Sequence, residues 1–67
     1  MAKPLQPHQQ RVVEERVELM VKLDKLVTFL KGDVFHGLPE DEQERLTRQH
    51  KIMSDYSEVL AERIVHF

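Results

Sequence analysis

Apolar residues recur every three or four positions along two long stretches of this chain, and the stretch between them breaks the pattern. Neither residues 8–31 nor residues 40–67 contain a proline or a glycine. In the first stretch, the helical spacing is kept by Val12, Leu19, Leu23, Leu26 and Leu30. Residues spaced by three, four or seven positions lie on one side of an α-helix. The pattern predicts an all-α protein with one helix over residues 8–31 and another over residues 39–66.

Residues 32–38 carry the signals that end one helix and begin the next. Gly32 follows the first helical stretch, and a glycine in the left-handed conformation commonly ends a helix. Pro39 suits the first turn of the next helix, and the three acidic residues after it suit the positive end of the helix dipole. Long helices joined by a short connector pack antiparallel. We therefore predict an antiparallel two-helix hairpin, a single domain over residues 8–67 that follows a flexible segment over residues 1–7.

The second helical stretch has polar residues in the row that we expect to face the first helix. With alternating spacings of three and four, this predicted seam passes through Leu46, Gln49, Met53, Tyr56, Leu60, Arg63 and Phe67. Arg16 interrupts the corresponding row of the first helix. Because an unpaired buried polar group costs about 1–3 kcal/mol, these groups must pair, reach solvent or serve a function. Two interpretations stay open: a network that fixes the register of the helices, and a ligand site.

More apolar residues lie on the two predicted helices than one helix–helix contact covers. Those beside the main rows are Val13, Val17, Met20, Val27, Ile52, Val59 and Ile64. The connector adds Val34, Phe35 and Leu38, which we expect to fold back over the end of the hairpin. Folded monomers rarely expose so much contiguous apolar surface, and a chain of 67 residues builds only a marginal core. We therefore predict a homo-oligomeric helical bundle, beginning with a four-helix dimer, and no folded monomer.

The candidate ligand-binding residues have side chains that suit an anionic nucleotide. The set is Arg11, Arg16, Gln49, Tyr56 and Arg63. Guanidinium groups bind phosphate through paired N–H donors, a tyrosine ring stacks on a base, and an amide forms hydrogen bonds with the edge of a base. Arg11 also falls in one row with Glu15, Glu18 and Lys22, whose structural interpretation is a ladder of surface salt bridges.

Composition and motifs argue against several other functions. Acidic and basic residues interleave to a net charge of −2, whereas a nucleic-acid-binding protein would show a basic excess. The four histidines do not have metal-site spacing, and we see no nucleophile motif or glycine-rich phosphate loop. We therefore expect no enzyme, metal or cofactor. No apolar run approaches the ~20 residues of a membrane span and no secretory signal precedes the first helix, so a soluble cytosolic protein is expected.

One set of residues, spread over nearly everything after the first seven positions, carries a family resemblance: residues 8–15, Leu23–Leu26, Phe29, Leu30, Phe35, Leu38–Gln43, Gln49, Met53, Tyr56, Leu60, Arg63, Ile64 and Phe67. Through these residues the chain resembles a family of very small tailed-phage proteins related to one from crAss-like phages. In size and hairpin form the chain is also similar to phage anti-defence sponges, which are small helical oligomers. Those proteins sequester cyclic nucleotide or ADP-ribose-derived immune messengers between subunits. This second likeness is one of form and rests on no shared sequence motif.

The resemblance implies a phage counter-defence protein that acts without catalysis in the host cytoplasm. It would hold a small anionic cyclic nucleotide or ADP-ribose-derived signal in a cleft between subunits. The alternative is an oligomeric protein–protein interaction module that inhibits or scaffolds a host or phage protein, such as a host defence protein. In that case the polar seam residues would fix the register of the helices, and the outer apolar residues would contact the partner.

Overall fold

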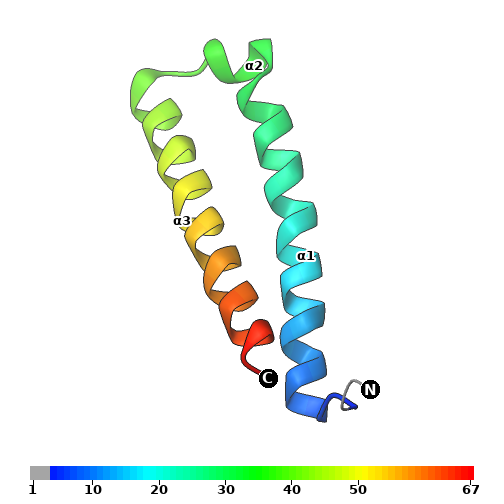
Figure 1. Ribbon diagram of the computed structural model, residues 1–67. Helices are drawn as coiled ribbons and strands as arrows, with labels where there is room; N and C mark the ends of the chain where they lie inside the picture. Colours follow the sequence, from blue (N-terminus) through cyan, green and yellow to red (C-terminus); the bar gives the residue numbers. More distant parts are fainter. Residues whose placement is uncertain (1–3) are drawn as a thin grey trace.

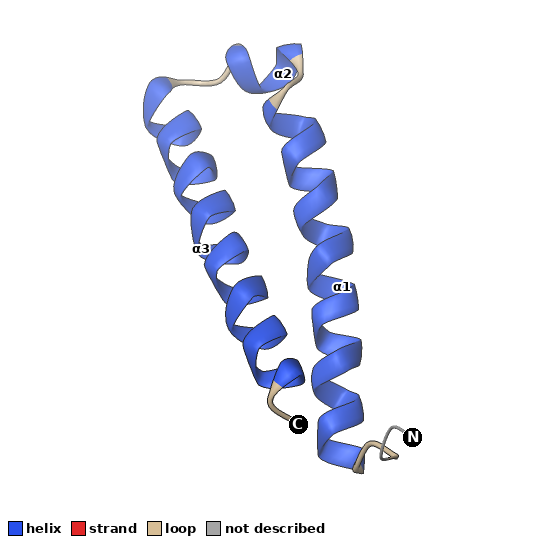
Figure 2. Ribbon diagram, in the orientation of Figure 1, coloured by secondary structure: helices blue, strands red, loops and turns tan. Residues whose placement is uncertain are grey.

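The computed structural model describes residues 4–67 and shows a long, narrow helical hairpin (Figure 1). The elements are α1 (Pro7–Leu30), α2 (Asp33–His36) and α3 (Glu40–Val65). Helices α1 and α3 run antiparallel, so both ends of the described chain lie at the end of the hairpin far from α2. Every regular element among residues 4–67 is a helix (Figure 2), which confirms the all-α prediction. The principal extents are 51 × 16 × 15 Å.

The predicted flexible segment falls partly outside the described residues, because the description begins at Pro4. Pro7 is the first residue of α1, where its missing N–H costs no hydrogen bond. The backbone N–H of Gln6 donates to the side-chain oxygen of Gln9 at 2.9 Å, and this contact closes the first turn. Local capping therefore defines where α1 begins, one residue before the predicted start.

Gly32 does not end α1 through a left-handed conformation, so this part of the prediction is wrong. Its φ of −91° and ψ of 167° are extended, and Lys31 before it stays right-handed. The last turn closes instead through the N–H of Lys31 to the Thr28 carbonyl and the N–H of Gly32 to the Phe29 carbonyl. Gly32 serves as the N-cap of α2. The chain starts a new helix at once, and an extended residue provides the necessary change of direction.

The connector contains the short helix α2, which the sequence pattern did not predict. Phe35 is buried there, and its ring meets the Phe29 ring edge-on with centroids 6.4 Å apart. Leu38 is half-buried, but Val34 points into solvent with 67% of its surface exposed. The prediction that the connector folds back is therefore confirmed for Phe35, while Val34 takes no part. A single turn of helix turns one aromatic ring inward and the neighbouring side chains outward.

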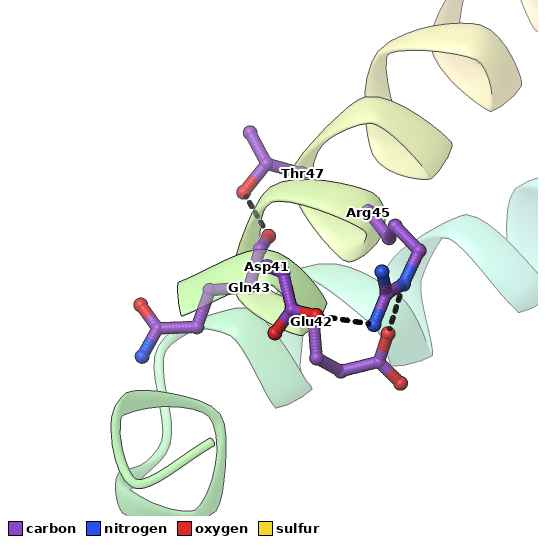
Figure 3. Close-up of polar contacts among 5 residues, drawn as sticks. All are labelled: Asp41, Glu42, Gln43, Arg45 and Thr47. Carbon is purple, nitrogen blue, oxygen red and sulfur yellow. Dashed lines mark hydrogen bonds and ion pairs between the residues drawn. The ribbon is translucent and has the colours of Figure 1, made fainter. Parts of the chain in front are cut away.

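The first turns of α3 tie the connector to the second long helix. The Gln43 side chain donates to the carbonyl oxygens of Leu38 at 2.8 Å and His36 at 3.2 Å. On the exposed side of the same turns, Arg45 reaches back to Asp41 and Glu42 (Figure 3). These carboxylates raise the pKa of the Arg45 guanidinium above its ordinary value, with the hydrogen bond to Glu42 as the main cause. The start of α3 is therefore held by side chains from its own first turns.

Few side chains are buried between the two long helices. The hydrophobic cluster consists of Val12, Leu19 and Leu60, with Met53 and Ile64 packed against it. Only Leu60 is wholly buried among the described residues, with 0% of its surface exposed. Val12 and Leu60 lie in the half of the hairpin near the chain ends, so most of the core lies there. The hairpin is held mainly by this one group of aliphatic contacts.

Replacing Leu60 with alanine should therefore cost much of the stability of the fold. Leu-to-Ala changes at buried sites cost about 2–5 kcal/mol, because burial is lost and a cavity is left. Val34→Ala is the control, since 67% of the Val34 surface is exposed and the residue lies on α2, outside the core. Urea unfolding followed by circular dichroism at one protein concentration measures both variants. Equal destabilisation by the two substitutions would contradict this assignment of the core.

Candidate functional site

The face of α3 that meets α1 differs from the predicted seam by one helical position. Leu46, His50, Met53, Ser57, Leu60, Ala61 and Ile64 are buried or half-buried, whereas Gln49, Tyr56 and Arg63 are exposed. The prediction that these three polar residues lie between the two helices of the hairpin is therefore wrong. Both rows fit helical spacing, and the pattern could not decide between Tyr56 and Ser57. Ser57 faces α1 and is buried, and its small side chain fits between the two helices.

Arg16 is half-buried and lies at one edge of the helix–helix contact. Its Nε donates to the backbone carbonyl oxygen of Ser57 at 3.4 Å. The Ser57 hydroxyl donates to the sulfur of Met20 at 3.1 Å. No hydrogen-bonding side-chain atom buried among residues 4–67 lacks a partner. Arg16 thus links α1 to α3, but through a backbone carbonyl and not through Gln49, Tyr56 or Arg63, so the expected network among these four residues does not form within the chain.

Helix geometry decides which exposed residues share a side of the hairpin. Each residue turns about 100° from the one before it. Because α1 and α3 are both right-handed and run antiparallel, residues that precede inward-facing positions lie on the same side in both helices. In α3 these include Gln49, Ile52, Tyr56, Val59 and Arg63, and in α1 they include Arg11, Glu15 and Glu18. We call these eight residues the Tyr56 face. Arg45, Lys22 and Lys25 lie farther along the same side, toward α2.

Two guanidinium groups lie at the same end of the Tyr56 face. Arg63 is in the last turn of α3, and Arg11 is near the start of α1, so both lie at the end of the hairpin where the chain begins and ends (Figure 1). Both side chains are exposed. The ion pairs found among residues 4–67 all lie within α3 and join Arg45 or Lys51 to nearby carboxylates. The predicted salt-bridge ladder along α1 is therefore not formed in this structure.

The candidate residues thus divide into two groups within one chain. Gln49, Tyr56 and Arg63 form a row with a spacing of seven residues, and Arg11 lies on the same side. Arg16 lies at the opposite edge of the helix–helix contact, where Ser57 and Met20 are its neighbours. Four of the five candidates therefore share one surface, and Arg16 is separate from them.

The surface around these residues is open in the single chain. The part of the chain from Pro4 to Phe67 contains no pocket. No cluster of His, Asp or Glu within these same residues has the arrangement of a metal site. None of the helices described for the chain has the length and hydrophobicity that crossing a membrane requires. A small ligand on the Tyr56 face of one chain would therefore stay exposed to water.

Comparison with known protein families finds one family whose members match this chain. The model of the Sequestin family matches residues 6–66, which is nearly the whole chain. The chain belongs to the Sequestin family. The match includes all three helices and the connector, so it covers both the hairpin and the Tyr56 face. The family name indicates a protein that sequesters something.

A curated phage protein supports the same assignment. It is the uncharacterized 7.5 kDa protein in the denB–rIIB intergenic region of Enterobacteria phage T4. It is 40% identical over 60 residues, which cover 90% of this chain and 94% of the relative. No solved structure matches the chain. The expected membership in a family of small phage proteins is therefore confirmed, while the relation to crAss-like phages stays a prediction.

The one-position difference between Tyr56 and Ser57 can be tested by placing leucine at each position. Ser57→Leu inserts a large side chain where helices are close, and overpacking of this kind costs about 1–3 kcal/mol. Tyr56→Leu should change the free energy of unfolding by less than about 1 kcal/mol, since 43% of the Tyr56 surface is exposed. Thermal and urea unfolding measure both. If Ser57→Leu were more stable than the wild type, position 57 would have space for a leucine side chain, and the assignment of Ser57 to the tightly packed contact would be wrong.

Proposed function

We propose that this Sequestin is a non-enzymatic phage counter-defence protein. It binds a small anionic immune signal of the host, a cyclic nucleotide or an ADP-ribose derivative, and keeps it from its receptor in the host cytoplasm. The family name and the phage relative support sequestration. The observation that carries the choice of ligand is the common face of Arg11, Arg63 and Tyr56.

The Tyr56 face offers separate groups for the two ends of a nucleotide. Arg63 and Tyr56 are two turns apart, or about 10 Å along the helix at 1.5 Å per residue. Arg63 and Arg11 would bind phosphate with charge-assisted hydrogen bonds, and the Tyr56 ring would stack on the base. Gln49, two further turns along, would form hydrogen bonds with a second base or the edge of the first. The phosphates would thus lie toward the chain ends, about one turn beyond the carboxylate of Glu15 and two turns beyond that of Glu18.

A second copy of the chain would close the site. Small-molecule sites usually bury most of the ligand, and the described residues of one chain form no pocket. Ile52 and Val59 lie on the Tyr56 face between the polar residues and are more than half exposed. They would pack against the second copy and exclude water around the ligand. The proposed site is therefore a cleft between subunits.

A protein–protein interaction module is the second candidate function. The specific observation that favours it is the aliphatic part of the Tyr56 face, since exposed Ile52 and Val59 are suited to a protein partner. In that case Tyr56 and Arg63 would be contact residues for a host or phage protein, because interfaces are enriched in Tyr and Arg. A ligand screen separates the two functions.

The proposed function predicts that Arg63→Leu loses nucleotide binding and keeps its fold. A thermal-shift screen of cyclic dinucleotides and ADP-ribose cyclics first identifies a ligand, because a ligand that binds only the native state raises the melting temperature. Removing a charge-assisted phosphate contact should then cost on the order of 2–3 kcal/mol, or tens-fold in affinity. Calorimetry with that ligand makes the measurement.

Arg48→Leu is the matched control for this experiment. Arg48 is also an exposed arginine of α3, but it is outside the Tyr56 face. Its replacement removes the same charge and should leave the affinity within about twofold of the wild type. Equal losses in the two variants would mean that only net charge matters. If no nucleotide in the screen raises the melting temperature, the protein–protein module becomes the better explanation.

A further inference from the structure

The side of the hairpin opposite the Tyr56 face carries an exposed aliphatic surface on α1. Val13, Val17, Met20 and Val27 each follow an inward-facing or half-buried residue, which places them together on that side. We call these four residues the α1 outer face. On the same side α3 presents the half-buried Ser54 and Ala61, whose side chains are too small to cover it, and the exposed Lys51 and Glu58. As a result, 59% of Val17 and 43% of Met20 stay exposed.

We infer that the α1 outer face is a self-interface, in which the α1 helices of two copies pair antiparallel. Its four residues are all apolar, and the exposed Asp24, which follows half-buried Leu23, lies on the same side. A mainly apolar composition of this kind is typical of permanent interfaces. The Tyr56 face, in contrast, mixes aliphatic groups with Arg, Glu, Gln and Tyr. The sequence pattern had grouped the apolar residues beside the main rows together. The structure places the four α1 residues on one side, Ile52 and Val59 on the other, and Ile64 against the core.

The surface area of the chain supports a partner of this size. Its accessible surface is 5538 Å² for 8.0 kDa, and a compact monomer of that mass exposes roughly 4,500 Å². The excess of roughly 1,000 Å² is close to the ~800 Å² that each partner buries in a standard interface. A surface of that extent suits a second helix, and the chain itself has such a helix with a matching aliphatic row.

The charges along α1 favour a second copy in the antiparallel orientation. A two-fold axis near Met20 brings Val13 onto Val27 of the second copy, because both are seven residues from Met20. The same axis brings Glu14 beside Lys25 of the second copy, and Arg16 toward its Asp24. A parallel pair would instead place each of these charges beside its own equivalent, which is unfavourable. The charges and the apolar row of α1 therefore both favour a second copy of the chain with its α1 helix antiparallel.

This self-interface does not depend on the proposed ligand site. The two faces point in opposite directions, so one neighbouring copy cannot cover both. If the Tyr56 face also closes against a second copy, as proposed above, the assembly contains more than two chains, because each chain then has two different neighbours. The α1 outer face would hold the assembly together permanently, and the Tyr56 face would bind the ligand.

Sedimentation of Val17→Glu tests the interface without any nucleotide. A glutamate at the centre of the α1 outer face should lower the assembly mass at micromolar concentration by at least half. Val34→Glu is the matched control, because Val34 is similarly exposed, at 67% against 59%, and lies on α2 away from both faces. It should leave the mass unchanged. A wild type that sediments as a single chain, a Val17→Glu assembly of unchanged mass, or equal dissociation of both variants would overturn the inference.

A charge exchange keeps the test decisive if Val17→Glu fails to fold. Glu14→Lys and Lys25→Glu each place like charges together in the antiparallel pair, so each variant alone should self-associate several-fold more weakly than the wild type. Mixing the two variants restores opposite charges at both positions. Native mass spectrometry of the mixture should show mixed complexes above the statistical proportion. A statistical or smaller proportion of mixed complexes would overturn the antiparallel pairing.

Discussion

One narrow line of aliphatic contact between α1 and α3 supports the whole molecule. Leu60, Val12 and Leu19 form its centre, and Leu60 alone is wholly buried among the described residues. A helix that packs against a single neighbour buries one row of side chains and leaves the rest of its surface to water. The hairpin therefore has a large surface for its mass. The two exposed faces described above are the surfaces on which we propose further contacts.

The connector matters because it fixes how the two long helices align along their length. Phe35 packs edge-on against Phe29 at the end of α1, and Gln43 binds the connector carbonyls from the start of α3. These contacts decide that Arg63 lies at the same end of the hairpin as Arg11. A shift of one turn would move one guanidinium away from the other by about 5 Å. The short helix α2 thus affects the relative positions of Arg11 and Arg63, although it lies at the opposite end of the molecule.

The hairpin separates two kinds of chemistry onto two sides. The Tyr56 face combines guanidinium, amide and phenol groups with exposed aliphatic residues, and the α1 outer face consists of four apolar residues with Asp24 beside them. Between them, Arg16 and Ser57 provide the polar contact that closes the edge of the core. The proposed function assigns ligand binding to the first side, and the proposed self-interface lies on the second.

The sequence by itself determined the all-α class, the two long helices and the surplus of apolar side chains, because helical spacing and the Pro39 start are local signals. It also indicated that Arg11, Gln49, Tyr56 and Arg63 are unusual. It did not determine α2 or the extended conformation of Gly32. Both depend on the burial of Phe35 against the end of α1, which is a tertiary contact. Only the tertiary structure decided that Ser57, and not Tyr56, faces α1. The rows through Ser57 and Tyr56 both fit helical spacing, and only the close approach of a second helix distinguishes a position that requires a small side chain from one that leaves a ring exposed.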